Sequence, residues 1–336
     1  MKRVRIDHSI EALYSEPRGR LTNPFRLASA VSLSFIEKHP LAWLSISPFS
    51  FPIAEKTIFH SSYYRISKSK KAINVVTVYD FTAERYFKGM RRYIHQKRKK
   101  NALLHGHGLI CISHNTKSDL LRLYPFADEK KIRVIYCGVS NDFGVLPKSA
   151  IDLHFKYTDV VKGKPVLYVG SRASYKNFPI AAQAVSLLND DFKLLIIGDK
   201  LSNKETAFLD KVLKNRYCCV TGIDHKTLNI FYNLSHCFIY PSGYEGFGIP
   251  LLEAMKAGCP VVTTNKSSIP EVVGEAAIMV DEISPAHFAE AILKLSDEQV
   301  RTQFIDRGLQ QSTKFSWNKC YDEVKGFYKE LYDSIP

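Results

Sequence analysis

The run YPSGYEGFGIPLLEAMKAGCPVV (residues 240–262) constrains this chain more than any other feature. It places one carboxylate, Glu245, ahead of a Gly-Phe-Gly turn and a second, Glu253, within the apolar segment that follows. Gly246 and Gly248 let the backbone approach a ligand closely, and the free N–H groups and dipole of the next helix favour bound phosphate. Because eight residues make just over two helical turns, the two carboxylates can reach opposite ends of one elongated ligand.

A second motif, GSRASYKN (residues 170–177), follows the apolar run at 165–170. Arg172 and Lys176 lie four residues apart at a predicted turn from strand to helix. Both cations can therefore converge on one anion beside the N-terminal amides of the helix. The alternative is that the two side chains form ordinary surface salt bridges.

The rest of the chain reads as two α/β units. Strands are predicted over residues 71–80, 108–113, 132–136, 165–170, 192–198, 218–222 and 237–241. Strands that alternate with helices imply parallel sheets, whose ligands lie at the carboxyl ends of the strands. Pro147, Gly163 and polar residues around 144–163 indicate a linker, and 336 residues suffice for two domains that each have a core.

The segment from Tyr240 to Asp281, including residues 267–273 and 276–281, resembles the donor-binding half of retaining GT-B glycosyltransferases. Within them it is most similar to family four (group 1), of the type that builds bacterial surface polysaccharide. The resemblance implies an α/β fold with two Rossmann-like domains that face a central cleft. It predicts an acceptor-binding domain over 1–150, a nucleotide-sugar-binding domain over 151–315, and a C-terminal helix, 316–336, that crosses back to the first domain.

The resemblance also implies roles for the residues of the two motifs. Arg172 and Lys176 would hold the donor diphosphate and stabilise the leaving nucleotide, Glu253 would bind the ribose, and Glu245 would hold the sugar. Arg172, Lys176 and Glu245 are the predicted catalytic residues. The predicted donor-binding residues are Gly170, Arg172, Lys176, Glu245, Gly246, Phe247, Gly248, Ile249 and Glu253. The alternative for the two glutamates is a helix-start acid and a solvated helix residue.

Neither a cofactor nor a metal is expected. The chain has no Asp-x-Asp motif placed to carry manganese, so the two cations are expected to replace a metal beside the diphosphate. The resemblance implies retention of configuration, which requires no general base, because the leaving phosphate can itself accept the proton of the acceptor. Catalysis then depends on positioning and on electrostatic stabilisation of the departing diphosphate.

The acceptor side is predicted from residues 58–65, 78–84 and 112–119, which resemble acceptor-side loops of the family. The candidate residues are His60, Arg65, Tyr79, Asp80 and Glu84. A capped turn or a core histidine is the alternative. Two departures stand out: Tyr79 occupies a position where the family commonly has histidine, and residues 10–26 contain Gly19 alone where a glycine-rich loop is usual. A shortened or reorganised first domain is therefore expected.

Charge is divided unevenly. Residues 1–150 contain 26 Lys and Arg against 11 Asp and Glu, whereas residues 151–336 contain 21 against 22. The surplus concentrates in a segment that also carries aromatic and aliphatic residues and is predicted as a helix: Arg85, Lys88, Arg91, Arg92, Lys97, Arg98, Lys99 and Lys100. This mixture suits an anionic membrane surface. No nucleic-acid recognition motif is present, and the alternative is a solvated helix end.

Localisation is predicted from two absences. No apolar run reaches the ~18 residues that a membrane-spanning helix needs, and the first residues, MKRVRI, lack the apolar region of a secretory signal. The expected location is the cytoplasm, peripherally on the inner face of the plasma membrane. The seven cysteines lie in apolar surroundings without Cys-x-x-Cys spacing, so buried free thiols are expected.

The predicted function is retaining transfer of a hexose from a nucleotide-diphosphate sugar to a lipid-linked or growing saccharide acceptor. The setting implied by the resemblance is lipopolysaccharide, O-antigen or capsule biosynthesis. The main alternative is a donor-binding but catalytically impaired, N-terminally shortened glycosyltransferase remnant, suggested by Tyr79 and the missing glycine loop. An epimerase of the same two-domain architecture is a more distant alternative, because it would not need the basic face.

Overall fold

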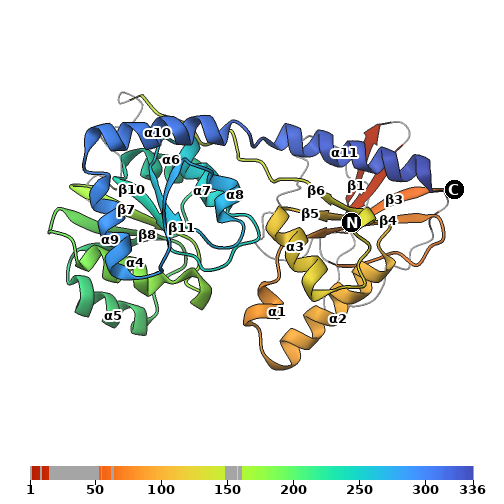
Figure 1. Cartoon of the computed structure of the whole chain (residues 1–336), viewed down its shortest axis with the longest axis horizontal. Helices are drawn as coiled ribbons and strands as arrows, with labels where there is room; N and C mark the ends of the chain where they lie inside the picture. The colour runs from red at the N-terminus through yellow and green to blue at the C-terminus, as the bar shows by residue number, and fades with distance from the viewer. Residues whose placement is uncertain are drawn as a thin grey trace. The chain divides into compact units, whose positions relative to one another are not determined.

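The computed structural model of the protein describes residues 2–7, 10–14, 53, 55–61, 64–147, 157 and 161–335, with the backbone alone over 2–14. The segment at 10–26 discussed for its single glycine therefore lies mostly outside the described residues, as does much of the predicted linker. Strands β1 (Lys2–Asp7) and β2 (Ile10–Tyr14) pair as an antiparallel hairpin (Figure 1).

The chain divides into two compact units. Unit 1 contains residues 1–138 and 317–336, and unit 2 contains Val139–Ser316. The boundary predicted at residue 150 lies inside unit 2, and the C-terminal helix α11 (Trp317–Ser334) belongs to unit 1. Among the described residues, no helix is long and apolar enough to cross a membrane.

Unit 1 contains a parallel four-stranded sheet in the order β3-β4-β5-β6. Its strands are β3 (Thr57–Ser61), β4 (Ala72–Val78), β5 (Gly108–Cys111) and β6 (Ile132–Val134). The helices between them are α1 (Thr82–Tyr86), α2 (Gly89–His105) and α3 (His114–Leu123), and a short 3-10 turn follows at Glu129–Lys131. Every residue of β4 is buried, as expected for an inner strand covered on both faces.

Helix α11 packs against this sheet (Figure 1). Phe327 and Leu331 lie so close to Gly108 that a Cβ atom there would come within 2.4 Å of the Leu331 side chain. The absence of a side chain at this glycine therefore lets the helix lie directly on β5. Tyr328 bonds through its hydroxyl to a ring nitrogen of His60 in β3.

Unit 2 is built on a fully parallel six-stranded sheet in the order β12-β11-β10-β7-β8-β9. The strands are β7 (Lys164–Val169), β8 (Phe192–Ile197), β9 (Tyr217–Val220), β10 (Cys237–Tyr240), β11 (Val261–Thr264) and β12 (Ala277–Val280). The helices are α4 (Phe178–Ser186), α5 (Asn203–Leu213), α6 (His225–Leu234), α7 (Ile249–Lys256), α8 (Ile269–Val273), α9 (Pro285–Lys294) and α10 (Glu298–Ser312). A 3-10 turn, Ser174–Lys176, precedes α4.

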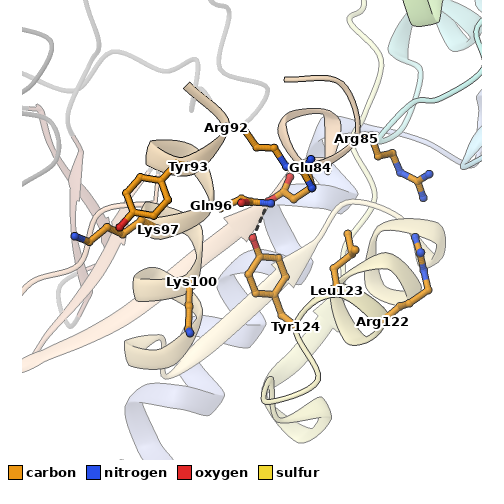
Figure 2. A pocket seen from close by; sticks show the side chains of 10 residues that line it. All are labelled: Glu84, Arg85, Arg92, Tyr93, Gln96, Lys97, Lys100, Arg122, Leu123 and Tyr124. Carbon is orange, nitrogen blue, oxygen red and sulfur yellow. Dashed lines mark hydrogen bonds between the residues drawn. The ribbon is translucent and has the colours of Figure 1, made fainter. Parts of the chain in front are cut away.

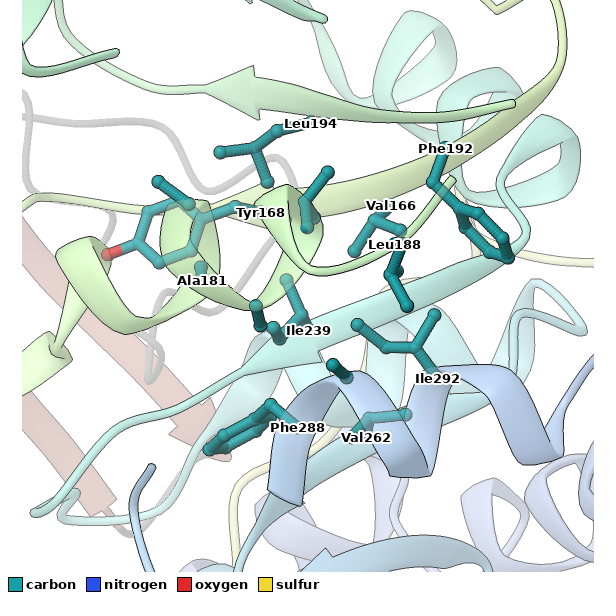
Figure 3. Packing of buried hydrophobic residues seen from close by; sticks show 14 of the residues in the cluster. Val166, Tyr168, Ala181, Leu188, Phe192, Leu194, Ile239, Val262, Phe288 and Ile292 are labelled. Atoms are coloured by element: carbon teal, nitrogen blue, oxygen red, sulfur yellow. The ribbon is translucent and has the colours of Figure 1, made fainter. Parts of the chain in front are cut away.

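The core of unit 2 lies between the sheet and the helices α4 and α9. Figure 3 shows Val166 and Ile239 of the central strands facing Ala181 of α4 and Phe288 and Ile292 of α9. These side chains are all fully buried. The continuous apolar runs that predicted these strands are thus the inner layer of a three-layer unit. Of the seven free cysteines, five are buried as predicted, whereas Cys218 and Cys219 are half-buried.

The least expected feature of unit 1 is a buried cation. Lys99 of α2 is 2% exposed, and its Nζ donates to Oε2 of Glu84 at 2.9 Å and to the carbonyl oxygen of Asp80 at 2.7 Å. The hydroxyl of Tyr124 donates to the other carboxylate oxygen at 2.8 Å, and the ring of Phe81 lies 4.2 Å from the ammonium group. The prediction that Lys99 belongs to the exposed basic surface is therefore wrong, because the residue forms a buried, hydrogen-bonded ion pair.

We expect Lys99→Ala to destabilise the protein by about 3 kcal/mol or more, because it leaves the buried carboxylate of Glu84 without its cation. Lys97→Ala, on the exposed side of the same helix, should change stability by less than about 0.5 kcal/mol. Urea denaturation followed by circular dichroism measures both. Equal effects of the two substitutions would show that the buried pair does not stabilise the fold.

Candidate functional site

The order of the strands in unit 2 defines where a ligand would bind. From the central strand β7 the chain adds β8 and β9 on one side, then crosses to β10 and continues through β11 and β12 on the other. The carboxyl ends of β7 and β10 therefore form the topological switch point of the sheet, where open α/β sheets have their ligand crevice. The loops that leave these two strands are the two motifs of the sequence, residues 170–177 and 241–248.

Backbone geometry brings the two loops together. The amide of Gly243 donates to the carbonyl oxygen of Tyr175 at 2.8 Å, and the side chain of Asn177 donates to the carbonyl oxygen of Pro241 at 2.9 Å. Gly170, with φ of +132°, starts the first loop in a conformation that favours glycine, and no atom lies within 4 Å of the position its Cβ would take. The two loops are thus joined to each other, and the space beside the backbone of Gly170 is open.

An ion pair links the predicted diphosphate and sugar residues. Nζ of Lys176 lies 2.5 Å from Oε1 of Glu245, and both side chains are largely buried. The same ammonium group also contacts the hydroxyl of Tyr240, the last residue of β10, at 3.1 Å. The structure therefore brings Lys176 and Glu245 together, although they are far apart in the sequence.

Two serines in the turn after β11 hold the backbone of the Glu245 loop. The hydroxyl of Ser268 donates to the carbonyl oxygens of Glu245 and Phe247, at 2.9 and 3.1 Å. Ser267, at a φ of +58°, accepts from the amide of Glu245 at 3.0 Å and also bonds to its carbonyl oxygen. Both serines lie in the segment 267–273 that carried the family resemblance, but the sequence did not indicate that they hold the Glu245 loop.

Arg172 is paired with a carboxylate that the sequence reasoning missed. Its Nε donates to Oε1 of Glu205 at 2.5 Å, and Nη2 donates to the carbonyl oxygen of Lys200 at 2.9 Å. The guanidinium hydrogen bond holds the pKa of Glu205 at about 2, well below its ordinary value. The available signal was the Ser202-x-x-Glu205 capping box at the start of α5.

One guanidinium nitrogen of Arg172 remains without a partner. The Nη1 atom is buried and makes no hydrogen bond to the described residues. An unsatisfied buried donor of this kind costs free energy until an acceptor reaches it. Arg172 and Lys176 therefore occupy the edge predicted for them, and each is neutralised by a glutamate of the protein.

Glu253 lies within α7, whose start is well arranged for an anion. Gly248 precedes the helix at a φ of +106°, and no side chain caps the first amides. Glu253 accepts a hydrogen bond from the hydroxyl of Tyr232 at 3.2 Å, and burial raises its pKa to about 7. The carboxyl group of Glu253 therefore keeps its proton to a higher pH than an exposed glutamate does.

The remaining donor-side candidates differ in accessibility. Gly246 and Ile249 are half-buried beside the start of α7. Phe247 is 3% exposed, and its ring packs edge-on against Phe315 at a centroid distance of 5.8 Å. Its side chain thus supports the loop from inside unit 2, so that only its backbone could contact a bound donor.

In unit 1, Tyr79 and Asp80 are the acceptor-side candidates that reach the ligand edge of the sheet. They follow β4 directly, and Oδ1 of Asp80 accepts from the amide of Thr82 at 2.9 Å. Arg65 is half-buried, and its amide donates to Oγ of Ser61 at the end of β3. The structure adds the exposed His114 at the start of α3, which lies within the predicted acceptor-side segment 112–119 but is not among the candidates named from the sequence.

His60 and Glu84 have structural contacts instead. The ring nitrogens of His60 bond to the hydroxyls of Tyr328 and Thr77, and burial lowers the pKa of His60 to about 4. It is therefore neutral at physiological pH and joins two strands to α11, which is the core-histidine alternative. Glu84 belongs to the buried ion pair with Lys99.

The described part of the chain contains no group of three or more His, Cys, Asp or Glu side chains that could hold a metal ion. The charged groups at the edge of the unit 2 sheet are instead two cations and the carboxylates that pair with them.

Comparison with known proteins identifies the class. The family model for glycosyl transferases group 1 matches residues 151–326, more than half of the chain, so the chain belongs to this family. It is 28% identical over 286 residues to the O-antigen chain mannosyltransferase B of Escherichia coli, covering 82% of this chain and 74% of that protein. It is 37% identical over 240 residues to the serotype-specific mannosyltransferase WbdA of Escherichia coli, covering 67% of this chain and 29% of WbdA.

The fold is also shared with solved structures. The crystal structure of HepE from Anabaena in complex with UDP-glucose matches 81% of this chain and 78% of that chain, with a TM-score of 0.70 at 14% identity. The two Rossmann-like units with parallel sheets are those of the GT-B fold. The prediction of a GT-B glycosyltransferase is confirmed.

The raised pKa of Glu253 predicts how stability depends on pH. Because the folded-state pKa of about 7 exceeds the ordinary 4.5, the folded protein keeps a proton that the unfolded chain loses, so this stabilisation disappears as pH rises from about 4.5 to 7. We expect Glu253→Gln to be more stable than the parent by about 1–2 kcal/mol at pH 8 and nearly equal to it at pH 5. Thermal unfolding at both pH values measures the difference.

The exposed Glu275 provides the control. Glu275→Gln should shift stability similarly at pH 5 and pH 8. If Glu253→Gln gave no larger benefit at pH 8 than at pH 5, the buried carboxyl would not carry the raised pKa.

Proposed function

We propose that the protein is a retaining glycosyltransferase of family four that transfers a hexose from a nucleotide-diphosphate sugar to a saccharide acceptor. Mannose is the first sugar to test, because the two relatives above are mannosyltransferases. The O-antigen role of the first relative supports a place in the assembly of bacterial surface polysaccharide, on a lipid-linked or growing chain.

The observation that carries the proposal is the ion pair of Lys176 with Glu245 across the switch point between β7 and β10, with Arg172 in the same loop as Lys176. Two cations beside open backbone suit a diphosphate, which forms strong charge-assisted hydrogen bonds with such groups. Glu245 in the loop and Glu253 within α7 are proposed to accept hydrogen bonds from hydroxyl groups of the sugar and of the ribose. Structural relatives solved with UDP and UDP-glucose support a nucleotide-sugar donor.

The proposed chemistry needs no group beyond these side chains. As the bond between the sugar and the diphosphate breaks, negative charge grows on the leaving phosphate, and Arg172 and Lys176 stabilise it. A donor diphosphate would draw Lys176 from Glu245, which frees the carboxylate to bind the sugar. The leaving phosphate takes the proton of the acceptor hydroxyl on the face where the new bond forms. We therefore propose catalysis without a metal ion.

The acceptor is proposed to bind at the ligand edge of unit 1, where Tyr79, Asp80 and His114 follow successive strands. Backbone carbonyls, a carboxylate and an exposed imidazole are suited to the hydroxyl groups of a saccharide. The family resemblance implies histidine at the position of Tyr79, so this residue is where the proposed acceptor edge differs from the expected pattern.

We further propose that α2 lies on an anionic membrane surface. Its exposed face carries Met90, Tyr93 and Leu104, which are 70%, 58% and 50% exposed and recur at spacings of three and eleven residues, with Lys97 between them. These spacings place all four on one stripe of the helix. Apolar side chains interleaved with cations suit the boundary between headgroups and acyl chains.

The activity test uses a panel of mannose and glucose nucleotides with a saccharide acceptor. We expect one donor to be turned over, and the anomeric configuration of the product, read by proton NMR, to match that of the donor. Chelation by EDTA should leave the rate unchanged. Glu245→Gln should lower kcat by about a hundredfold, because the contact to the reacting sugar strengthens in the transition state.

Glu275→Gln, which removes an exposed carboxylate of the same unit, is the matched control and should be fully active. Donor binding without transfer or hydrolysis under any acceptor would instead favour the catalytically impaired remnant. Inversion of configuration, or recovery of an isomerised sugar nucleotide, would contradict the proposal.

The membrane proposal predicts that Met90→Ser with Leu104→Ser weakens binding to vesicles of phosphatidylglycerol and phosphatidylcholine by about tenfold, since two apolar side chains no longer enter the interface. Leu187→Ser with Leu293→Ser removes two similarly exposed side chains from unit 2 and should have no effect. Vesicle flotation measures both variants, and equal binding by the first variant and the parent would exclude α2 as the contact.

A further inference from the structure

A cavity lies in unit 1, between α2 and the C-terminal end of α3. Its volume is about 590 Å³, which is within the usual range for small-molecule sites. Its charged lining residues are Arg85, Arg92, Lys97, Lys100, Arg122 and Glu84. Five cations and one carboxylate therefore line this space, and the proposed donor site in unit 2 does not account for it.

The single carboxylate does not neutralise the cavity. Both oxygens of Glu84 are already engaged. One accepts from the buried Lys99. The other accepts from the hydroxyl of Tyr124, as Figure 2 shows. Two of the lining cations, Arg85 and Arg122, share the carboxylate of Asp119. The carboxylates of Glu84 and Asp119 are thus already paired with other groups and do not neutralise the remaining cations.

Three cations of α2 are left to face the cavity. Arg92, Lys97 and Lys100 have no ion-pair partner among the described residues. Figure 2 shows the side chain of Arg92 extending toward Glu84 at the centre of the lining, whereas the ends of Lys97 and Lys100 point outward. The flexible stems of the two lysines allow their ammonium groups to turn toward a bound anion.

The positions of these residues along α2 explain why they share one wall. Arg92 and Lys100 are eight residues apart, with Gln96 between them, so all three follow a single line along the helix. Lys97 and Lys100 are three residues apart on the same helix, so their charges repel one another, and an anion relieves that repulsion. The half-exposed ring of Tyr93 and the side chain of Leu123 add an apolar rim for the organic part of a ligand.

We propose that this cavity binds a phosphate or diphosphate ester, with Arg92 as the principal ligand and Lys97 and Lys100 as supporting cations. A guanidinium group can pair with two phosphate oxygens at once. Because the cavity has few carboxylates, the guanidinium group of Arg92 is available for this pairing. The ester can belong to a membrane lipid headgroup or to a soluble phosphorylated saccharide. The inference concerns unit 1 alone and does not rest on the proposed donor site in unit 2.

The test is calorimetric titration of the full chain with inorganic pyrophosphate, without a divalent metal. We expect two binding events in the parent, one from each site. In Arg92→Gln with Lys100→Gln, the Kd of the cavity event should rise at least tenfold, so that this event is lost from the titration. Arg172→Ala with Lys176→Ala removes the donor-site event and leaves that of the cavity. The matched control is Arg91→Gln with Arg98→Gln, which removes two cations from another face of α2 and should retain the cavity event.

The inference is overturned if pyrophosphate binds Arg92→Gln with Lys100→Gln as it binds the parent, or if the control loses the same event. A single event in the parent that disappears in Arg172→Ala with Lys176→Ala would support the donor site and exclude the cavity site, so the two proposals fail separately. A thermal-unfolding curve for each variant establishes that it is folded.

A second arm identifies the source of the ester. Vesicles of phosphatidylcholine containing phosphatidic acid are floated with the parent and with Arg92→Gln, Lys100→Gln. Release of the parent from these vesicles by millimolar pyrophosphate, with weak binding by the variant, assigns a lipid headgroup. Vesicle binding that is equal in the two proteins, together with the calorimetric difference, assigns a soluble phosphate ester.

Discussion

The ion pair between Lys176 and Glu245 is the interaction on which the arrangement of the unit 2 site depends. It joins the loop after β7 to the loop after β10, so it crosses the point where the order of the sheet reverses. The loops are further joined by the backbone hydrogen bond from Gly243 to Tyr175 and by the side chain of Asn177, and Ser267 and Ser268 fix the backbone around Glu245. The charged groups are thus oriented by parts of the chain that themselves touch no proposed ligand.

This pairing gives the site a defined resting state. Lys176 is neutralised by Glu245, and Arg172 is neutralised by Glu205. Charges paired inside a protein cost less to bury than isolated ones, so the unit is stable with its cations in place. A diphosphate would compete with protein carboxylates for the same cations, which favours ligands that carry more negative charge than a single carboxylate.

The fold and most residues of the proposed donor site could be predicted from the sequence. The strands are short apolar runs, and the site residues lie within contiguous motifs, so both are visible in the local order of residues. Glu205 and Ser268 escaped prediction, since they act through contacts made only when distant loops meet. Lys99 was misassigned for a related reason: in the sequence it is one of several adjacent cations, and only the fold turns it inward toward Glu84. His60 likewise has the pattern of a site residue and the contacts of a core residue.

The central claim is that Lys176 binds the diphosphate of a nucleotide. Equilibrium titration of the full chain with UDP and with GDP, compared with Lys176→Met, tests it most directly. The account predicts that the better nucleotide binds the variant at least tenfold more weakly, because a charge-assisted contact to phosphate is lost. Lys226→Met removes an exposed lysine of the same unit and should bind like the parent. Unchanged affinity in Lys176→Met, or an equal loss in Lys226→Met, would contradict the account.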